Sequence, residues 1–315
     1  MQRPYRAIMN RSWTAGGSAR SVAGMTFHET HATQTHPIVW LITGASRGFG
    51  LEIVRRALGR GDRVVATARR PEQITDAVGE HENLLVTALD VTDQDSVDSA
   101  VAQAVERFGR IDVLVNNAGH GFVGALEEVS DAELRALYDV NVFGLAAVTR
   151  TVLPVMRRQR AGRVLNLSSV AGFSGAPGWG AYSSSKFAVE AFTESMRAEL
   201  APLGISVTVI EPGYFRTDFL DGSSLRIARH RIEDYDPTAG ASRTLSENTN
   251  HLQPGDPRRA VAAILQIVDA SEPPLRLQLG ADCVARVEGK LDYVRGELET
   301  WRELSLSTNY ADAIA

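Results

Sequence analysis

Tyr182 and Lys186 are an ionisable hydroxyl and a cation at a spacing that would bring them together. They stand four residues apart in a stretch that we expect to be helical, which puts both on one helix face. A free tyrosine has a pKa near 10, roughly three units or about 4 kcal/mol from neutrality. One cation about 4 Å away supplies around 4 kcal/mol at an effective dielectric of about 20. Lys186 could therefore bring Tyr182 into the range of a general acid or base.

Two further polar residues could join this pair. Ser169 precedes Tyr182 by 13 residues and ends an expected strand, while Asn141 lies inside a long expected helix. Asparagine has low helix propensity, so its position invites a functional reason. Taken singly, the tyrosine and lysine also fit a surface pair, and Ser169 fits a plain strand end. The spacing alone leaves both interpretations open.

A glycine-rich loop, Thr43-Gly44-Ala45-Ser46-Arg47-Gly48-Phe49-Gly50, follows the first expected strand and opens a helix. Glycines let the backbone approach a pyrophosphate, and the helix N-terminus that follows favours an anion. Glycine loops also arise as simple turns, but a preceding strand and a following helix are the context that dinucleotide binding requires. The loop is not a Walker loop, because no Gly-Lys-Ser/Thr follows.

The end of the second expected strand bears on which dinucleotide would bind. NAD-specific sites usually place an acid there, on the ribose 2′-hydroxyl. Here the strand ends Ala66-Thr67-Ala68-Arg69-Arg70, without an acid, and Arg47 is a second cation in the loop. A guanidinium suits a 2′-phosphate. The sequence therefore favours NADP(H) over NAD(H). The alternative is that Arg69 and Arg70 form a solvated turn.

The elements that must position these residues alternate between short apolar strands and longer helices. We expect strands at residues 38–42, 63–67, 84–89, 111–115, 163–167, 206–210 and 275–279. We expect helices at residues 51–59, 94–108, 131–158 and 181–203. This alternation predicts an α/β protein with a Rossmann-type, doubly wound parallel sheet. Residues 37–300 would form this single domain, with a polar substrate loop at about 214–257.

Composition sets further bounds. The chain has 315 residues, 44% hydrophobic and 23% charged, with a net charge of −5. This is ordinary globular usage without the basic excess of a nucleic-acid binder. The single cysteine, Cys283, permits no internal disulfide and fits a reducing, cytoplasmic setting. We expect no metal, since no His/Cys cluster is evident, and no membrane span, since no apolar run nears about 20 residues.

The two ends of the chain are expected to lie outside the domain. Residues 1–36 contain several arginines and no acid before Glu29. We expect a disordered leader, with organelle targeting by this segment as the alternative. Residues 301–315 are expected to form a C-terminal tail.

The chain resembles the compact, single-domain branch of the short-chain dehydrogenase/reductase family, strongly over residues 37–220. The motifs that carry the resemblance are Thr43-Gly44-x-x-x-Gly48-x-Gly50, Asp90-Val91, Asn116-Asn117-Ala118-Gly119, Asn141, Ser169, Tyr182-x-x-x-Lys186 and Pro212-Gly213-x-x-x-Thr217. The resemblance implies hydride exchange between a nicotinamide and a carbonyl or alcohol carbon. It also implies a homodimer or homotetramer that pairs the helices at 131–158 and 181–203.

The resemblance also implies residue roles. Tyr182 would be the general acid/base, and Ser169 would hydrogen-bond the substrate oxygen. Lys186 would bind the nicotinamide ribose and lower the pKa of Tyr182, and Asn141 would help to hold a proton-relay water. The further cofactor contacts that it implies are Gly44, Ser46, Arg47, Gly48, Phe49, Gly50, Arg69, Asp90, Val91, Asn117, Pro212, Gly213 and Thr217.

A small apolar carbonyl or alcohol is the expected substrate, because aromatic residues lie in the variable parts near the site. These candidates, any of which could instead pack in the core, are Phe122, Phe173, Trp179, Tyr214, Phe215 and Phe219. The C-terminal Leu279-Gly280-Ala281-Asp282, with Lys290-Leu291 and Trp301 beyond it, is similar to 17β-hydroxysteroid and retinol dehydrogenases. Two alternatives stay open: a non-catalytic NADP-binding regulatory protein, and an enoyl reductase, against which the four-residue Tyr/Lys spacing argues.

Overall fold

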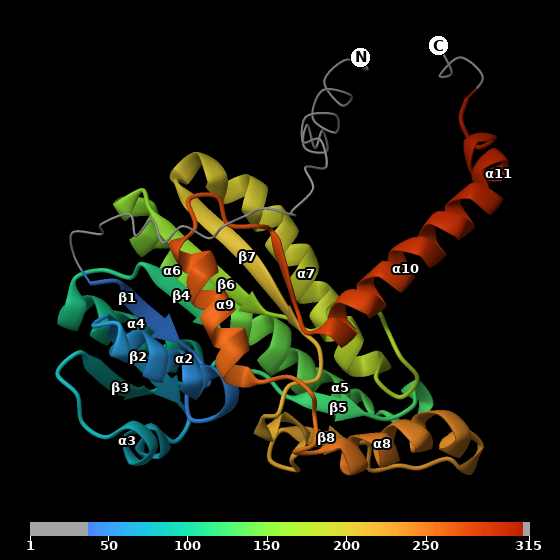
Figure 1. The fold of residues 1–315 in the computed structure, drawn as a ribbon, viewed down its shortest axis with the longest axis horizontal. Coiled ribbons are helices and arrows are strands. Elements are labelled where there is room, and N and C mark those ends of the chain that lie inside the picture. Colours follow the sequence, from blue (N-terminus) through green and yellow to red (C-terminus); the bar gives the residue numbers. More distant parts are fainter. Residues whose placement is uncertain (1–36, 311–315) are drawn as a thin grey trace. The chain divides into compact units, whose positions relative to one another are not determined.

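Seven parallel strands form one sheet in the computed structural model, which describes residues 37–310 (Figure 1). The strands are β1 (Val39–Ile42), β2 (Arg63–Ala68), β3 (Leu84–Ala88), β4 (Val113–Asn116), β6 (Gly162–Leu167), β7 (Ile205–Pro212) and β9 (Arg276–Leu279). Their order is β3-β2-β1-β4-β6-β7-β9, so the chain changes direction across the sheet between β1 and β4, as in doubly wound folds. The predicted Rossmann-type α/β fold is confirmed.

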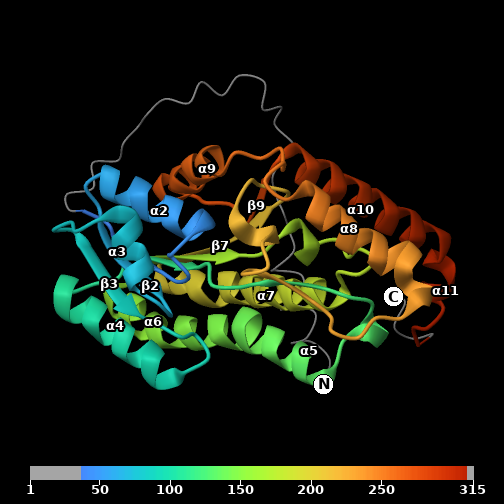
Figure 2. The ribbon, with the colours of Figure 1, turned by 90° about the horizontal axis from the view of Figure 1, so that it is seen from below.

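Helices cover both faces of this sheet (Figures 1 and 2). The helices of the described residues are α2 (Gly48–Gly59), α3 (Glu72–Val78), α4 (Gln94–Phe108), α5 (Asp131–Tyr138), α6 (Leu145–Gln159), α7 (Gly180–Leu200), α8 (Ala241–Thr249), α9 (Pro257–Asp269), α10 (Ala281–Thr300) and α11 (Arg302–Leu306). Of these, α2 and α9 pack on one face of the sheet and α4 and α6 on the other. Trp40 of β1 packs into the core under α2 and α9, and Leu41 packs into the core under α4 and α6. Because both faces are buried, β1 is apolar without alternation.

The helix expected at 131–158 is three joined pieces: α5, a π-helical turn at Asp139–Gly144, and α6. By length and composition this stretch could cross a membrane, with a mean hydropathy of 1.2 over an 18-residue window. Buried core helices share this length and composition, so the expectation of no membrane span stays a prediction. Since 56% of that window is buried inside the domain, the stretch packs as a core helix.

The predicted substrate loop, 214–257, contains ordered elements of its own. Its strand β8 (Leu225–Ile227) pairs in parallel with β5 (Gly121–Val123), outside the main sheet. Its helix α8 is tied down by a buried ion pair, in which Arg243 Nη1 lies 2.7 Å from Glu128 Oε2. Figure 1 shows this segment at the end of the sheet where the carboxyl ends of the strands point.

The predicted chain ends are only partly described. The leader at 1–36 and the last residues of the tail, 311–315, lie outside the described residues. The described part of the tail contains α11, which follows α10 after a break at Trp301.

Candidate active site

A cavity of about 360 Å³ opens at the carboxyl ends of the strands, where doubly wound folds bind ligands. Its walls are the glycine loop, the strand ends, the start of α7 and the first part of the substrate loop. The predicted residues that line it are Gly44, Ser46, Arg47, Gly48, Phe49, Arg69, Asp90, Val91, Asn117, Ser169, Tyr182, Lys186, Pro212, Gly213 and Thr217. Gly50 and Asn141 are not among the lining residues.

Close backbone packing explains two glycines of the loop. Gly44 has a φ of +63°, and a Cβ there would lie 2.9 Å from the Cα of Ala118. A Cβ at Gly50 would lie 2.6 Å from Nδ2 of Asn117, which donates to the carbonyls of Thr43 and Gly44 at 2.9 Å each. Gly50 and Asn117 therefore shape the loop from behind and leave its open side to the cavity.

The two arginines expected near a 2′-phosphate both reach the cavity. Arg69 is exposed just after β2 and lies near Asp90. Arg47 links the glycine loop to the substrate loop, because Nη1 donates to Oγ of Ser223 at 2.8 Å and Nη2 donates to the Ser223 carbonyl at 2.9 Å. Arg70 is exposed and does not line the cavity.

Ser169, Tyr182 and Lys186 meet at one end of the cavity. The Tyr182 ring is 4% exposed, and its hydroxyl is hydrogen-bonded with Ser169. Ser169 Oγ also accepts from the N–H of Ala171 at 3.1 Å, which fixes the serine just beyond β6. Lys186 Nζ donates to the Leu167 carbonyl at 2.6 Å and lies 5.9 Å from the centroid of the Tyr182 ring.

Burial governs the charge states of this pair. Burial raises the pKa of Tyr182 above its ordinary value, and the hydrogen bond with Ser169 offsets only part of this effect. Burial lowers the pKa of Lys186 to about 8, against the opposing effect of the Glu190 carboxylate. The expected lowering of the Tyr182 pKa is thus not found here, because desolvation of the phenolate dominates and the ammonium is directed to the Leu167 carbonyl.

Asn141 owes its position to the π-helical turn, a feature that often marks functional positions. Its Oδ1 accepts from the His120 N–H at 3.0 Å, and its Nδ2 donates to the His120 carbonyl at 3.0 Å and to Ser185 Oγ at 3.1 Å. The amide therefore braces the backbone of His120, whose side chain lines the cavity. Sequence reasoning did not single out His120; its place directly after the Asn-Asn-Ala-Gly motif is a signal that could have found it.

The six aromatic candidates divide into two groups. The four that line the cavity are Trp179, Tyr214, Phe215 and Phe219. The rings of Trp179 and Phe219 lie 5.7 Å and 5.6 Å from that of Tyr182. Phe122 is 1% exposed within the core, and Phe173 packs against the cluster at the start of α10. The prediction that Phe122 and Phe173 contact the substrate is therefore wrong, because both side chains pack inside the protein.

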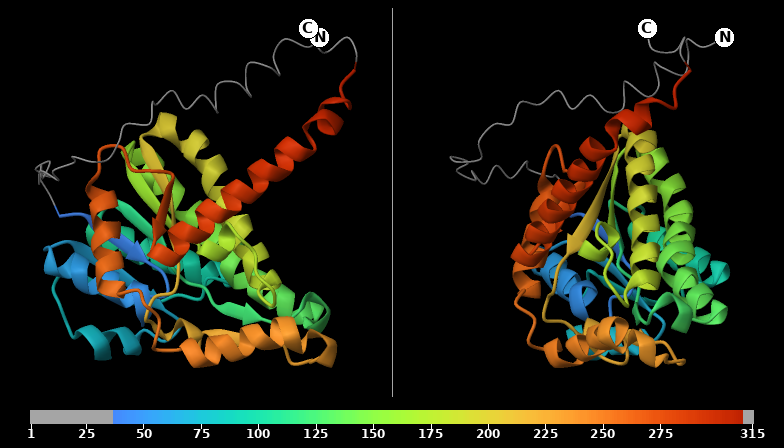
Figure 3. Two further views of the ribbon diagram at one scale, coloured as in Figure 1. Left: turned by 45° about the vertical axis from the view of Figure 1, so that its right-hand side comes forward. Right: turned by 90° about the vertical axis from the view of Figure 1, so that its right-hand side faces the viewer.

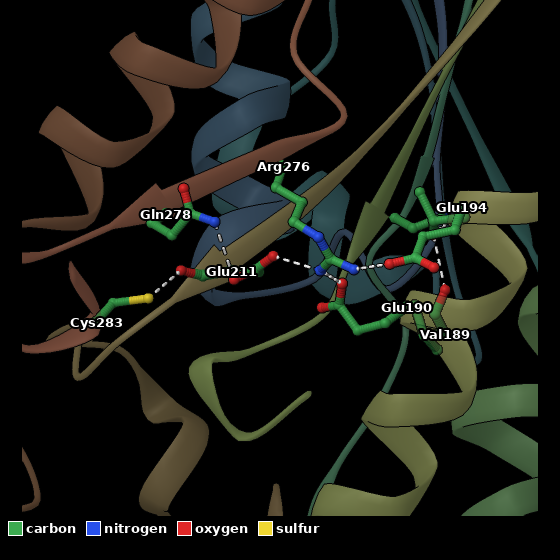
Figure 4. A network of polar contacts seen from close by, with 9 residues as sticks. Val189, Glu190, Glu194, Glu211, Arg276, Gln278 and Cys283 are labelled. Carbon is green, nitrogen blue, oxygen red and sulfur yellow. Dashed lines mark hydrogen bonds and ion pairs between the residues drawn. The ribbon is translucent and has the colours of Figure 1, made fainter. Parts of the chain in front are cut away.

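Figure 4 shows a partly buried ionic network around Arg276 that includes Glu190 of α7. Glu190 stands one turn after Lys186 on α7 and pairs with Arg276 of β9. Arg276 also pairs with Glu194, and it meets Glu211 at 2.9 Å. Burial raises the pKa of Glu190 to about 7, although Arg276 opposes this. Sequence reasoning missed this network because β9 and α7 are far apart in the chain.

Gln253 is a second unpredicted feature of the cavity. It is 1% exposed and lines the cavity, yet neither Oε1 nor Nε2 has a hydrogen-bond partner among the described residues. Buried amides are normally paired. Both amide atoms are enclosed by protein, so Gln253 is an unsatisfied buried group beside the cavity.

One group of side chains has metal-ligating atom types, which the sequence expectation of no cluster overlooked. Ligand atoms of Asp218, Asp221 and His251 lie within 4.8 Å of one another. Asp221 already pairs with His251 Nε2 at 3.1 Å and accepts from Asn250 at 2.6 Å. These contacts explain why the three side chains lie close together without any metal ion between them.

The fold and the cavity define the class of protein: a Rossmann-type domain in which a glycine loop and a buried tyrosine–lysine pair share one site. Comparison with known proteins gives the family. A family model described as short chain dehydrogenase matches residues 38–226. The chain belongs to this family of oxidoreductases.

Three curated relatives illustrate the range of the family. Oxidoreductase BOA17 of Botryotinia fuckeliana is 40% identical over 86% of this chain and 98% of its own. The 3-ketodihydrosphingosine reductase of Bacteroides thetaiotaomicron is 38% identical over 78% of this chain and 88% of its own. Human retinol dehydrogenase 8 is 36% identical over 77% of this chain and 81% of its own.

Solved structures agree with this family. A short-chain dehydrogenase from Streptomyces avermitilis is 42% identical and superposes with a TM-score of 0.82, covering 87% of this chain and 100% of its own. A serine dehydrogenase complexed with NADP⁺ is 28% identical, with a TM-score of 0.64 over 77% of this chain and 94% of its own.

Proposed function

We propose that the chain is an NADP(H)-dependent oxidoreductase that interconverts a ketone or aldehyde with an alcohol on a small apolar substrate. The observation that carries this proposal is the convergence of the Ser169, Tyr182 and Lys186 side chains at one end of the cavity that begins at the glycine loop. Relatives named as a keto reductase and a retinol dehydrogenase support the carbonyl–alcohol chemistry.

The chain's own residues would handle the substrate oxygen and its proton. A bound nicotinamide would supply or accept the hydride at the substrate carbon. Ser169 Oγ would hydrogen-bond the substrate oxygen, and the Tyr182 hydroxyl would give that oxygen a proton in reduction and take one back in oxidation. A raised Tyr182 pKa keeps the hydroxyl protonated, which is the form that reduction needs. Oxidation needs more positive charge beside the phenolate, and Lys186 is the cation within reach.

The cavity wall fits a dinucleotide. The glycine loop leaves its backbone open toward the cavity at the start of α2, and a Cβ at Gly44 would close against Ala118. A twelve-residue helix that starts at such a loop favours a pyrophosphate there. Arg69, after β2, supports a 2′-phosphate and hence NADP(H) over NAD(H).

The walls near Tyr182 support an apolar substrate. Trp179 and Phe219 flank the tyrosine ring, and aromatic walls favour apolar ligand surface. We further propose a cytoplasmic homodimer or homotetramer that binds neither metal nor nucleic acid, in keeping with the single cysteine and the net charge of −5.

The alternatives are a cofactor-binding protein without chemistry and an enoyl reductase. Both are tested by offering NADPH and a panel of ketones, aldehydes and enones to the full chain and to Tyr182→Phe. We expect the wild type to reduce C=O bonds and the variant to lose at least a hundredfold in rate while retaining NADPH fluorescence enhancement. NADPH binding without any turnover would favour the regulatory protein. Reduction of C=C bonds alone would favour the enoyl reductase.

A further inference from the structure

Helix α10 leaves the domain and has no covering among the described residues. Every residue from 291 to 310 is exposed, and Figures 1 and 3 show α10 and α11 projecting from the rest of the domain. Only the first turns of α10 pack, through Cys283 and Val287. The part of α10 that is exposed throughout begins at residue 291 and ends at Thr300, and isolated helices shorter than about 12–15 residues are marginal in water.

The exposed helix carries an apolar stripe with the spacing of a coiled-coil seam. Its apolar residues recur at alternating intervals of three and four, which places them on one side of the helix. They are Val284, Leu291, Val294, Leu298 and Trp301, which are exposed, and Val287, which is buried against Val170 and Cys283 of the domain. Leu291, Val294, Leu298 and Trp301 are 48%, 46%, 54% and 60% exposed. This is a contiguous apolar face of the kind that marks an interaction surface.

The stripe is complementary to itself when two copies run antiparallel. Setting Leu291 opposite Val294 of a second copy pairs the exposed centre of the stripe, and Leu298 and Trp301 then reach the base of the second α10, beside its buried Val287 and exposed Val284. Each layer then holds two apolar residues, and the twofold axis repeats each layer. We propose that α10 is a homodimerisation arm that pairs antiparallel with α10 of a second copy in this register.

The charges that flank the stripe favour this register. In it, Lys290 faces Glu297 of the second copy on one side of the seam, and Glu288 faces Arg295 on the other. The twofold axis doubles both contacts, so four opposite-charge pairs border the seam. A parallel pairing would instead set Lys290 beside Arg295, which is a like-charge contact. Flanking charges of this type choose partner and orientation in coiled coils.

A membrane surface is the less favoured occupant. Helices that bind membranes are rich in lysine and arginine on the polar face. Between residues 281 and 306, α10 and α11 carry four cationic and six acidic residues, so an anionic bilayer would repel the arm. The seam spans only about two and a half heptads, so we expect a dimer that dissociates on dilution.

The test is a charge-swap cycle in the full chain, read by sedimentation velocity over a wide range of protein concentration at low salt. Lys290→Glu and Glu297→Lys each set like charges across the seam, and each is expected to weaken dimerisation about tenfold. The double variant restores both pairs and is expected to return to within about threefold of the wild type. Glu297 is exposed and Lys290 is half-buried, and both contact Tyr293 of their own helix, so circular dichroism of each variant must first show unchanged helix content.

Three results would overturn the proposal. The first is equal dissociation constants in all four proteins, which would place any dimer on another surface. The second is single variants that weaken the dimer without rescue in the double variant, which would exclude this antiparallel register. The third is a wild type that stays monomeric and cosediments with phosphatidylcholine–phosphatidylserine vesicles, which would identify the occupant as a membrane.

Discussion

At the scale of single residues, the environment of each charged group decides what it can do. Tyr182 and Lys186 are both buried, and burial pushes each toward its neutral form. The site therefore begins with a protonated tyrosine and a lysine whose charge depends on its neighbours. Glu190, one turn further along α7, is the neighbour that opposes burial at Lys186.

The first residue-scale prediction concerns Glu190. Glu190→Gln removes the carboxylate that raises the pKa of Lys186, so the pKa should fall below about 8, by roughly one unit. The chain contains two lysines, Lys186 and Lys290. NMR of ¹³C-lysine-labelled protein carrying Lys290→Arg would therefore follow the Lys186 titration alone.

The matched control for this prediction is Glu194→Gln. Glu194 also pairs with Arg276 but lies two turns from Lys186 and is half exposed. We expect its loss to leave the Lys186 titration unchanged. If the Lys186 titration midpoint moved equally in Glu190→Gln and Glu194→Gln, the network would influence the Lys186 pKa through Arg276 rather than through the Glu190 charge.

The second residue-scale prediction concerns cofactor choice. Arg69→Ala should weaken NADPH binding about tenfold to a hundredfold, because a charge-assisted hydrogen bond is worth about 1.5–3 kcal/mol. NADH binding should be unaffected, since NADH lacks the 2′-phosphate. Arg70→Ala is the control, because Arg70 is exposed beside the cavity without lining it. Equal losses for NADPH and NADH, titrated by nicotinamide fluorescence, would contradict the 2′-phosphate assignment.

At the scale of elements, the substrate loop depends on one buried ion pair. Glu128 accepts from Arg243 at 2.7 Å and also from the N–H groups of Ala125 and Ile232 at 2.8 Å and 3.0 Å. Burial by itself would raise the pKa of Glu128, but these hydrogen bonds hold the pKa at about 2. The pair thus joins α8 and the chain around Ile232 to the turn before α5.

Arg243→Met leaves Glu128 buried without its partner, which should cost about 3–5 kcal/mol at neutral pH. Because the folded pKa of Glu128 is lowered, the contribution of the pair is complete above about pH 4.3. It is lost as the pH falls toward about 2. Urea unfolding at pH 7 and pH 3, with proteolysis of residues 214–257, measures both effects.

The control for the ion pair is Arg135→Met. Arg135 pairs with Asp131 at 2.7 Å on the surface, where the side chains are 75% and 76% exposed. A surface pair of this kind is worth about 0–1 kcal/mol. A loss at Arg243 no larger than the loss at Arg135 would show that the buried pair does not hold the substrate loop.

At the scale of the whole molecule, two apolar surfaces are available for assembly. One is the arm described above. The other lies on the π-helical turn and α7, where Phe143, Phe187 and Phe192 are 60%, 44% and 42% exposed. These are the helices through which the family resemblance implies pairing.

Phe187→Glu should lower the mass of the assembly in light scattering, because a carboxylate would be buried in an apolar contact. It should not change the effects of the Lys290 and Glu297 variants on dimerisation through α10, since those residues lie on a different element. If both surfaces pair, the wild type should form a tetramer with two kinds of twofold contact. Leu126→Glu, at a residue 73% exposed and outside both surfaces, is the control that should change nothing.

Sequence reasoning located most of the fold because its signals are local. Buried parallel strands appear as short apolar runs, and all seven strands of the main sheet fall within or next to the expected ranges. The π-helical turn that joins α5 to α6 was not expected within the helix at 131–158, because the spacing of apolar residues carries no signal for one extra residue in a turn. For the residues of α10, the sequence indicated only a similarity to 17β-hydroxysteroid and retinol dehydrogenases and did not predict a projecting helix.

The sequence by itself determined the parallel α/β fold and the glycine loop, because both depend on periodicity and spacing within a few tens of residues. It also determined that Tyr182 and Lys186 share a helix face. Only the tertiary structure decided the rest. Gln253, the ion pair between Glu128 and Arg243, and the Arg276 network depend on contacts between distant segments. The direction of the Tyr182 pKa depends on burial, and burial is a property of the packed molecule rather than of any run of residues.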